Sequence, residues 1–255
     1  MSVKVPPAAS AARYRSVDLL WQGKARPGRG PKPGLSLDAI VQGAIDVADR
    51  EGLASVTMNR VATRLGVTTM ALYRYVPGKD ELVDLMIDAA AGVPPPGRGL
   101  DWRTDLAQWA RANLAILHRH PWLVDSTTRR VPIGPTWMGW LESALQALAR
   151  QDLTAKEMMA VVILVDGHVR ATAQTSLGIT GQEEWAARFR HVLELTADDA
   201  RFPALRRVVA RGGFAGGRDD PRKQFEFGLQ RVLDGVEAFV RTRARQRGQR
   251  KSPSK

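Results

Sequence analysis

The sequence predicts an all-α fold, with a small N-terminal helical domain followed by a larger helical domain. In nearly every ordered stretch of the 255 residues, apolar side chains recur at positions i, i+3, i+4 and i+7, which places them on one helix face. No stretch shows the alternation with a period of two that a half-buried strand requires. The segment "GVPPPGRG" at 92–99 interrupts the helical pattern and is expected to join the two domains.

The first helices have clear start and stop residues. Ser36 is a plausible N-cap, and the apolar residues after it occupy one helix face until Gly52 ends the helix. Thr57 is the expected N-cap of a second helix, which Gly66 ends. Upstream of both, residues 16–22 can form a short helical turn.

Two more helices are expected after Gly66. The third begins at Thr68 or Thr69 and runs for about seven residues to the Pro-Gly pair at 77–78, and the fourth spans about 79–91. Two helices joined by a tight glycine-containing turn are typical of the helix-turn-helix unit, whose second helix lies in the DNA major groove. A short helical hairpin that only packs against the rest of the protein is the alternative.

Every segment beyond the joint is also expected to be helical. Pro121 closes the first of these helices, and residues 127–134 are expected to form a loop. The predicted helical ranges are 101–120, 135–151, 155–177, one or two helices within 182–211, and 222–245.

The positive charge is concentrated at the two ends of the chain. The net charge is +12, and residues 1–35 contain seven Lys or Arg and one Asp, while residues 241–255 contain seven Lys or Arg and no acid. Basic ends attract polyanions such as nucleic acid or an anionic membrane, or serve only to keep a protein soluble. The expected organisation is a flexible extension (1–35), the two domains (36–92 and 99–246) and a disordered tail (247–255).

The composition limits where the protein works. It contains no cysteine, and therefore no disulfide and no thiolate metal site, which suits a reducing compartment. The first 20 residues lack the apolar region of a signal peptide, and the longest apolar run in the middle of the chain, 158–165, is too short to span a bilayer. We therefore expect a cytoplasmic protein without a membrane partner.

The residues between 57 and 79 have the chemistry of a DNA-binding surface. Lysine and arginine neutralise phosphates, and threonine and tyrosine hydroxyls donate hydrogen bonds to phosphate oxygens. Small or flexible side chains at 69–71 allow close approach to base edges and thymine methyl groups. The stretch contains no acid and four basic residues, which are Arg60, Arg64, Arg74 and Lys79.

These features stand in one register in "GLASVTMNRVATRLGVTTMALYRYVPGKDELVDLMID", and residues 36–91 resemble the DNA-binding domain of the TetR family of transcriptional regulators. The segments "LHRHPWLVDSTTRRVPIGP", "VILVDGHV" and "FEFGLQRVLDGVEAFV" resemble the tetracycline-repressor branch of that family. The resemblance implies a three-helix DNA-binding domain, a larger ligand-binding and dimerisation domain, and a homodimeric repressor. Such a repressor binds a palindromic operator in double-stranded DNA and is released by a small molecule.

The resemblance also implies which residues contact DNA. The positions carried over are Asn59, Thr68, Thr69, Met70, Ala71, Tyr73, Tyr75 and Lys79, with Thr57 as the cap of the second helix. Asn59 stands where the tetracycline repressor has arginine, and residues 69–71 replace its Gln-Pro-Thr. A different operator is therefore expected, with less bidentate reading of guanine and more apolar contact.

The basic N-terminal extension is expected to contact DNA along the backbone or in the adjacent minor groove. Its basic residues in the Gly- and Pro-rich segment 23–34 are Lys24, Arg26, Arg29 and Lys32. A leader that never touches DNA is the alternative. For the C-terminal tail, a solvated segment is favoured over a second DNA contact, because it leaves the dimerisation domain.

The last helix is expected to form a two-fold interface, with the helix at 155–177 as its partner. Two glycines lie seven residues apart in it, and since glycine costs roughly 1 kcal/mol in a helix interior, the pair indicates closely approaching backbones. The predicted interface residues are Phe225, Gly228, Leu229, Val232, Gly235 and Val236. Packing within one subunit is the alternative. A dimer would place two recognition helices about 34 Å apart, the spacing of successive major grooves.

An effector site is predicted from tryptophans and from polar residues on an apolar helix. Asp166, Arg170 and Gln174 are spaced by four and share a face, and buried polar groups need partners, one of which can be a ligand. The predicted ligand-binding residues are Trp102, Trp122, Trp137, Trp140, Asp166, His168, Arg170 and Gln174. The alternatives are plain core packing of the tryptophans and a surface ion pair between Asp166 and Arg170. The effector is expected to be small and apolar or aromatic.

No cofactor or metal is expected. The histidines form no obvious cluster, and the magnesium-ligand histidine of the tetracycline repressor falls near Val131, which argues against a tetracycline–magnesium effector. An enzyme is not expected either, because the nucleophile elbow, the zinc-protease helix, the phosphate-binding loop and the dinucleotide fingerprint are all missing from the sequence. A transcriptional activator, or a DNA-binding protein without an effector, remains an alternative.

Overall fold

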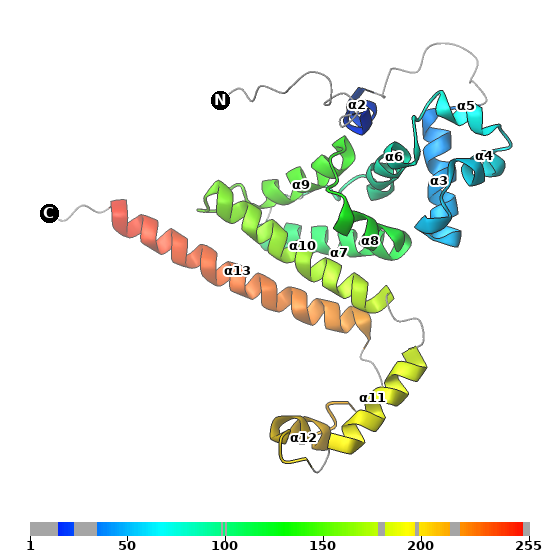
Figure 1. The fold of residues 1–255 in the computed structure, drawn as a ribbon. Helices are drawn as coiled ribbons and strands as arrows, with labels where there is room; N and C mark the ends of the chain where they lie inside the picture. Colours follow the sequence, from blue (N-terminus) through cyan, green and yellow to red (C-terminus); the bar gives the residue numbers. More distant parts are fainter. Residues whose placement is uncertain are drawn as a thin grey trace.

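The computed structural model describes residues 15–22, 35–97, 99, 101–177, 182–196, 199–214 and 220–251. All regular elements in these ranges are helices, and Figure 1 shows most of them in one cluster with two long helices along one side. Buried side chains from Leu20 to Val240 form one continuous core that includes both predicted domains. The all-α prediction is confirmed.

The N-terminal helices follow the predicted caps. The Ser36 hydroxyl accepts from the Ala39 N–H at the start of α3, and the Thr57 hydroxyl accepts from the Arg60 N–H at the start of α4, both at 3.1 Å. Gly66 has φ 67° after α4, a left-handed conformation that glycine adopts without steric cost. The elements are α3 (Leu37–Glu51), the 3-10 turn η1 (Leu53–Ser55), α4 (Met58–Leu65), α5 (Thr69–Tyr73) and α6 (Lys79–Ala91).

Helix α5 is shorter than predicted. It ends at Tyr73, and the amides of Tyr75 and Val76 both donate to the Leu72 carbonyl, each at 2.9 Å. Leu72 and Val76 are fully buried, so the chain turns inward after α5 instead of continuing the helix to the Pro-Gly pair.

The first three C-terminal helices contact α6 and continue the core. They are α7 (Trp102–Arg119), α8 (Trp122–Arg129), α9 (Pro135–Leu148), α10 (Ala155–Leu177), α11 (Gln182–Thr196), α12 (Pro203–Ala210) and α13 (Pro221–Lys251). Helices α10 and α13 lie side by side along the body, whereas α11 and α12 extend away from it (Figure 1). With these bounds, α13 is longer than the predicted range of 222–245.

The predicted loop at 127–134 is partly wrong, because α8 continues to Arg129. The hydroxyls of Ser126 and Thr127 donate to the carbonyls four residues earlier, which lets both residues lie inside a helix. Trp122, Leu123 and Val124 are buried and hold α8 on the core.

The short turn predicted at 16–22 is a helix, α2 (Arg15–Gln22), which packs against α6. Leu20 is buried in this contact. The Trp21 indole N–H donates to the Ile133 carbonyl at 3.0 Å, a partner that lies 112 residues further along the chain.

Candidate DNA-binding surface and effector cavity

Helix α5 presents a side to solvent that the core does not use. Its buried residue is Leu72, while Met70 is 73% exposed and Tyr73 is 46% exposed. Large apolar side chains are usually buried, so two of them exposed on one short helix indicate a surface that meets something else. Thr68 is exposed beside them, and Thr69 and Ala71 are half-buried.

The four basic residues of this region fall into two pairs with different roles. Arg60 makes a two-pronged ion pair with Glu51, and Arg64 pairs with Asp46 at 2.7 Å, so α4 is tied to α3. The hydrogen bond from Arg60 lowers the pKa of Glu51, and the one from Arg64 lowers the pKa of Asp46.

Arg74 and Lys79, by contrast, are exposed and have no ion pair within the described part of the chain. These two cations are therefore available to neutralise phosphates. Asn59 is exposed on α4.

The two tyrosines after α4 differ in their partners. The Tyr75 hydroxyl donates to the Leu35 carbonyl at 3.0 Å, and its ring is half-buried against the core. This bond holds the start of α3 against the turn after α5. The Tyr73 ring is exposed, and no hydrogen bond of its hydroxyl occurs among the described residues. Of the predicted pair, Tyr73 is the one exposed to solvent, and Tyr75 has a structural partner. Lys24, Arg26, Arg29 and Lys32 lie outside the described residues.

A cavity of about 300 Å³ lies between α7, α9, α10 and the 131–134 segment. It brings together four of the eight predicted ligand-binding residues. These are Trp137, Trp140, Asp166 and Arg170. The other walls are mostly apolar and include Trp109, Ile116, Met138, Met159 and Val162, which the prediction missed. Methionine and tryptophan at these positions are also ordinary core residues, so their sequence pattern alone does not mark a cavity.

One side of the cavity carries a connected polar group. Arg170 Nε donates to Asp166 Oδ2 at 2.6 Å, and Asn113 Nδ2 donates to Asp166 Oδ1 at 3.1 Å. The Arg170 guanidinium lies 6.0 Å from the centre of the Trp137 ring. The intrahelical ion pair and the cavity lining, predicted as alternatives, are therefore both present.

Trp109 and Trp140 form another part of the cavity wall. Trp109 Nε1 donates to the Trp140 carbonyl at 2.9 Å, and Trp140 Nε1 donates to the Gly92 carbonyl at 2.9 Å. The rings of Trp109 and Trp140 meet edge to face, with centroids 6.1 Å apart. Since both indole donors are satisfied within the protein, these rings offer a rigid apolar surface.

The structure places the other predicted ligand residues elsewhere. His168 stacks on Phe225 with ring centroids 5.2 Å apart, on the side of α10 that faces α13. Trp122 and Gln174 line a different crevice, between α3, α8 and the end of α10, and Trp122 Nε1 donates to Asp49 at 2.7 Å. Trp102 packs on the core outside the cavity. Residues spaced by four share a helix face but need not line the same cavity. Residues 166, 170 and 174 span two turns of α10, and because different helices pack along it, residue 174 lies at another crevice.

Three carboxylates of α6, of which Asp88 is buried, bond to the residues on either side of the 131–134 segment. Asp88 of α6 accepts from the backbone N–H groups of Trp137 at 2.9 Å and Thr136 at 3.3 Å, which are the orphan donors at the start of α9. Arg130 pairs with Asp84 of α6 at 3.0 Å and also with Asp80. Helix α6 follows α5 directly, so the cavity walls and the exposed surface of α5 are connected through one element.

The predicted dimer stripe faces inward. Phe225, Leu229 and Val236 are buried against the same chain, and Val232 is half-buried. A Cβ on Gly228 would lie 2.3 Å from the His168 ring, so this glycine allows α13 to approach α10 of the same subunit. A Cβ on Gly235, by contrast, would meet nothing within 4 Å.

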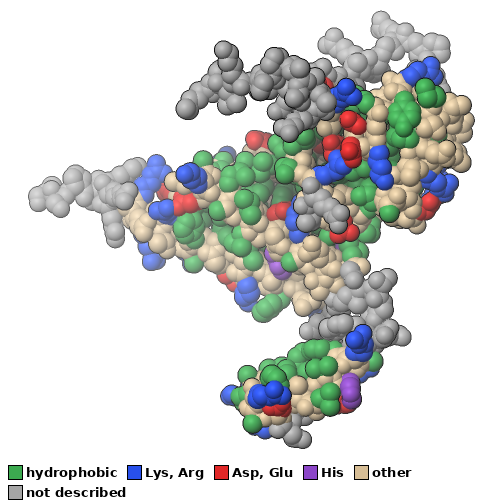
Figure 2. Space-filling view, in the orientation of Figure 1, with side chains coloured by type: hydrophobic (Ala, Val, Ile, Leu, Met, Phe, Trp, Pro, Cys, Tyr) green, Lys and Arg blue, Asp and Glu red, His purple; other side chains and the backbone are tan. Residues whose placement is uncertain are grey.

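A different apolar face is exposed on the same two helices. On α10 it consists of Ala160, Ile163, Leu164, Gly167 and Ala171, and on α13 it includes Phe227 and Phe239. The separate α11–α12 pair also exposes Val192, Leu195 and Val208, and Figure 2 shows green patches on this pair. These surfaces have no partner within the described chain that would explain their composition.

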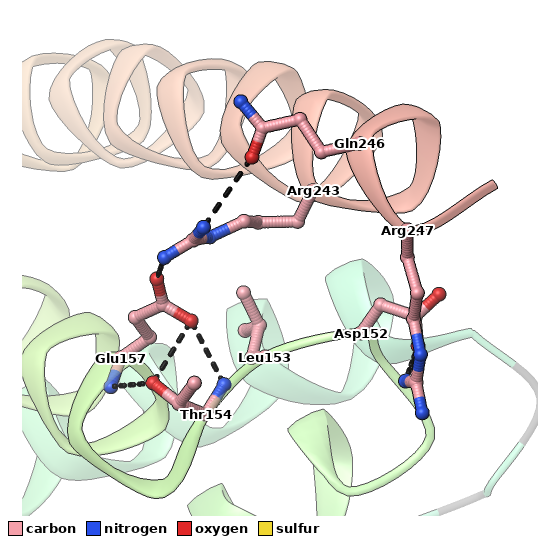
Figure 3. A pocket seen from close by; sticks show the side chains of 7 residues that line it. All are labelled: Asp152, Leu153, Thr154, Glu157, Arg243, Gln246 and Arg247. Atoms are coloured by element: carbon pink, nitrogen blue, oxygen red, sulfur yellow. Dashed lines mark hydrogen bonds and ion pairs between the residues drawn. The ribbon is translucent and has the colours of Figure 1, made fainter. Parts of the chain in front are cut away.

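A second cavity of about 370 Å³ lies under the C-terminal end of α13, and ion pairs form its walls (Figure 3). Arg243 pairs with Glu157, and Arg247 pairs with Asp152. Glu157 also accepts from the Thr154 N–H at 2.8 Å. The Thr154 N–H and then Arg243 lower the pKa of Glu157. These ion pairs attach the end of α13 to α10 and to the residues just before it. Because the charges pair with one another, we interpret this region as a structural contact and not as a ligand site.

The described residues contain no group of three or more metal-ligating side chains. None of the described helices combines the length and the apolar character that crossing a bilayer requires.

Comparison with known proteins identifies relatives over most of the chain. Residues 40–86 match the family described as bacterial regulatory proteins, tetR family, and residues 93–240 match the tetracyclin repressor-like C-terminal domain. The chain is 39% identical over 241 residues to the HTH-type transcriptional repressor DrrR1 of Streptomyces coeruleorubidus, covering 90% of this chain and 87% of that protein.

Solved structures show the same relationship. Apo ActR from Streptomyces coelicolor superposes with a TM-score of 0.70 at 27% identity, covering 82% of this chain and 98% of that one. ActR in complex with actinorhodin superposes with a TM-score of 0.68 at 28% identity, covering 82% and 99%.

Proposed function

Because this chain belongs to the TetR family of bacterial regulatory proteins, we propose that it is a repressor released from DNA by a small aromatic effector. It binds a palindromic operator as a homodimer, with α5 in the major groove. The effector occupies the cavity between α7, α9 and α10. The observation that carries the proposal is that α6 joins the exposed surface of α5 to the wall of that cavity through Asp88.

The lining of the cavity supports a flat aromatic effector. Trp137 and Trp140 provide ring surfaces, and Met138, Met159 and Ile163 add apolar walls. Arg170 keeps N–H donors beyond those it gives to Asp166 and Thr127, so it can bind an acidic or carbonyl oxygen of the effector. A related regulator of known structure, ActR, binds actinorhodin, which supports an effector of this kind.

The homodimer is proposed through the exposed face of α10 and α13, in place of the stripe predicted from the sequence. Small residues on this face, Gly167 and Ala171, let a second helix approach closely, while Leu164 and Phe227 supply apolar area. A homodimer presents two copies of α5, which is what reading a palindromic operator requires. The α11–α12 pair would lie against the second copy.

The DNA half of the proposal is tested with duplexes taken from the region upstream of the protein's own gene. Binding is measured by fluorescence anisotropy at about 0.2 M salt, where non-specific binding is weak. The expected result is tight binding to one palindromic duplex and about a thousandfold or more weaker binding to its scrambled version, in the range of known specificity ratios. Equal affinity for both duplexes would show a DNA-binding protein without an operator.

The effector half is tested by thermal shift with aromatic compounds, beginning with actinorhodin, followed by operator release for each compound that binds. Arg170→Gln is expected to weaken binding of such a compound about ten- to a hundredfold, since a charge-assisted hydrogen bond contributes roughly 1.5–3 kcal/mol. Arg119→Gln, on an exposed residue of α7 outside the cavity, is the matched control. A compound that binds equally well to the Arg170 variant and still releases DNA would contradict the assignment of this cavity.

A further inference from the structure

Helix α2 crosses a segment that forms part of the effector cavity. Leu20 is buried and anchors α2 on α6, while Trp21 is 53% exposed. The Trp21 indole N–H nevertheless has a specific partner, the carbonyl of Ile133 at 3.0 Å. Core packing does not explain a tryptophan in this position, because about half of the residue remains in solvent.

The segment that Trp21 contacts lies between α2 and the cavity. Val131 and Pro132 line the cavity, and the same two residues with Ile133 and Gly134 surround a small hollow beside Leu20. The inner and outer surfaces of this segment therefore face the effector site and α2, respectively.

Both ends of the segment are attached to α6. On the N-terminal side, Arg130 pairs with Asp84 at 3.0 Å. On the C-terminal side, Asp88 accepts from the Trp137 N–H at 2.9 Å. Gly134 permits this contact, because a Cβ at that position would lie 2.1 Å from Asp88 Oδ1. Only the middle of the segment, around Ile133, depends on α2.

We infer that α2 is a strap that holds the 131–134 segment against α6 through the bond between Trp21 and Ile133. An effector that fills the cavity presses on Val131 and Pro132 from the inside. With the strap in place, the segment cannot bulge outward alone, so the displacement passes through Asp88 and Arg130 to α6 and then to α5. Without the strap, the segment yields and less of the displacement reaches α6. This role rests on the proposed function, because it assigns to α2 a part in the effector response.

The first test needs neither DNA nor effector. Since the chain contains no cysteine, Val131→Cys gives a single site for a nitroxide label. Electron paramagnetic resonance then reports the mobility of the segment. Trp21→Phe, which removes the N–H donor and keeps an aromatic ring, is expected to raise this mobility. Arg15→Gln, on an exposed residue of the same helix, is the control and should leave it unchanged. An unchanged spectrum in the Trp21 variant would overturn the strap, whether or not the protein is a repressor.

The second test measures the response itself. The ratio of operator affinities without and with a releasing compound is compared between the wild type, Trp21→Phe and the control Arg15→Gln. The Trp21 variant is expected to lower this ratio roughly three- to tenfold, the effect of one hydrogen bond on a coupling. Its affinity for DNA in the absence of the compound should stay within about twofold of wild type, since its fold and α5 are unchanged. The control should leave the ratio unchanged. A Trp21 variant with the wild-type ratio would refute the coupling, whereas a wild type that releases no operator would refute the proposed function instead.

Discussion

The α4–α5 hairpin and the α10–α13 pair both have clear sequence patterns, but the structure agrees with the prediction from the pattern in the first region and differs from it in the second. In the hairpin, the N-cap, the glycine turn and the exposed side chains lie where the pattern predicts. In the α10–α13 pair, the predicted stripe with Phe225 and Leu229 is turned into the subunit's own core. The face left for a partner carries residues that the prediction did not select, such as Leu164 and Phe227.

The difference arises from the range of the interactions. Caps and turns involve residues three or four positions apart, so a short stretch of sequence determines them. Which face of a long helix is buried depends on what packs against it. Helices α10 and α13 each have apolar residues on more than one face, so the pattern does not determine which face packs in the core and which is left for a dimer interface.

Substitutions of the two glycines of α13 should give the largest difference in stability. The sequence pattern predicts the same role for both, whereas in the structure only Gly228 faces another helix of the subunit closely. Gly228→Ala forces a methyl group against the His168 ring and should lower the free energy of unfolding by about 2 kcal/mol. Gly235→Ala meets no atom within 4 Å of its own chain and should raise that free energy by up to about 1 kcal/mol. Chemical denaturation measures both.

A double variant sharpens this test. Adding His168→Ala to Gly228→Ala removes the clashing ring, so the cost of the glycine change should largely disappear in a double-mutant cycle. If Gly228→Ala is as well tolerated as Gly235→Ala, Gly228 is not a packing residue of the subunit. Weaker dimerisation of Gly235→Ala in sedimentation velocity would place that glycine at the interface.

The two tyrosines near α5 should separate DNA affinity from stability. Tyr73→Phe is expected to weaken operator binding about five- to tenfold with little change in stability, since one phosphate hydrogen bond per subunit is lost. Tyr75→Phe removes the bond to the Leu35 carbonyl and should lower the free energy of unfolding by about 1 kcal/mol. Anisotropy and thermal melting distinguish the two. Equal loss of operator affinity in both variants would contradict the separate roles.

The smallest expected effect is a pH dependence at the end of α13. The Thr154 N–H and Arg243 lower the pKa of Glu157 from its ordinary value of 4.5. A lowered pKa means that this contact stabilises the folded state above about pH 4.5 and loses its effect as the pH falls through the lower folded-state value. The difference in melting temperature between wild type and Glu157→Gln should therefore shrink on acidification from about pH 7 to pH 3.5.

The control for this experiment is Glu142→Gln, on an exposed carboxylate of α9 without an ion pair in the described part of the chain. Its difference from wild type should change less over the same range. A difference for Glu157→Gln that stays constant with pH would show that the ion pair does not couple to folding.

The candidate sites were predictable to different degrees. The exposed positions of Asn59, Met70 and Tyr73 followed from a short motif and its register. For the cavity, four residues were found from their chemistry, but Asn113 was missed because a single asparagine on an amphipathic helix carries no distinguishing signal. His168 lies outside this cavity, and only the packing of α13 shows that it stacks on Phe225. No sequence signal connects Trp21 with Ile133, which are 112 residues apart.

The sequence by itself determined the all-α class, the ends of the N-terminal helices and the exposed surface of α5, since these depend on contacts within a few residues. Only the tertiary structure decided which face of α13 is buried, which tryptophans meet around the cavity, and that α2 reaches the 131–134 segment. The physical reason is that a local pattern specifies which side chains share a helix face, whereas the partner of that face is chosen by the packing of the whole chain.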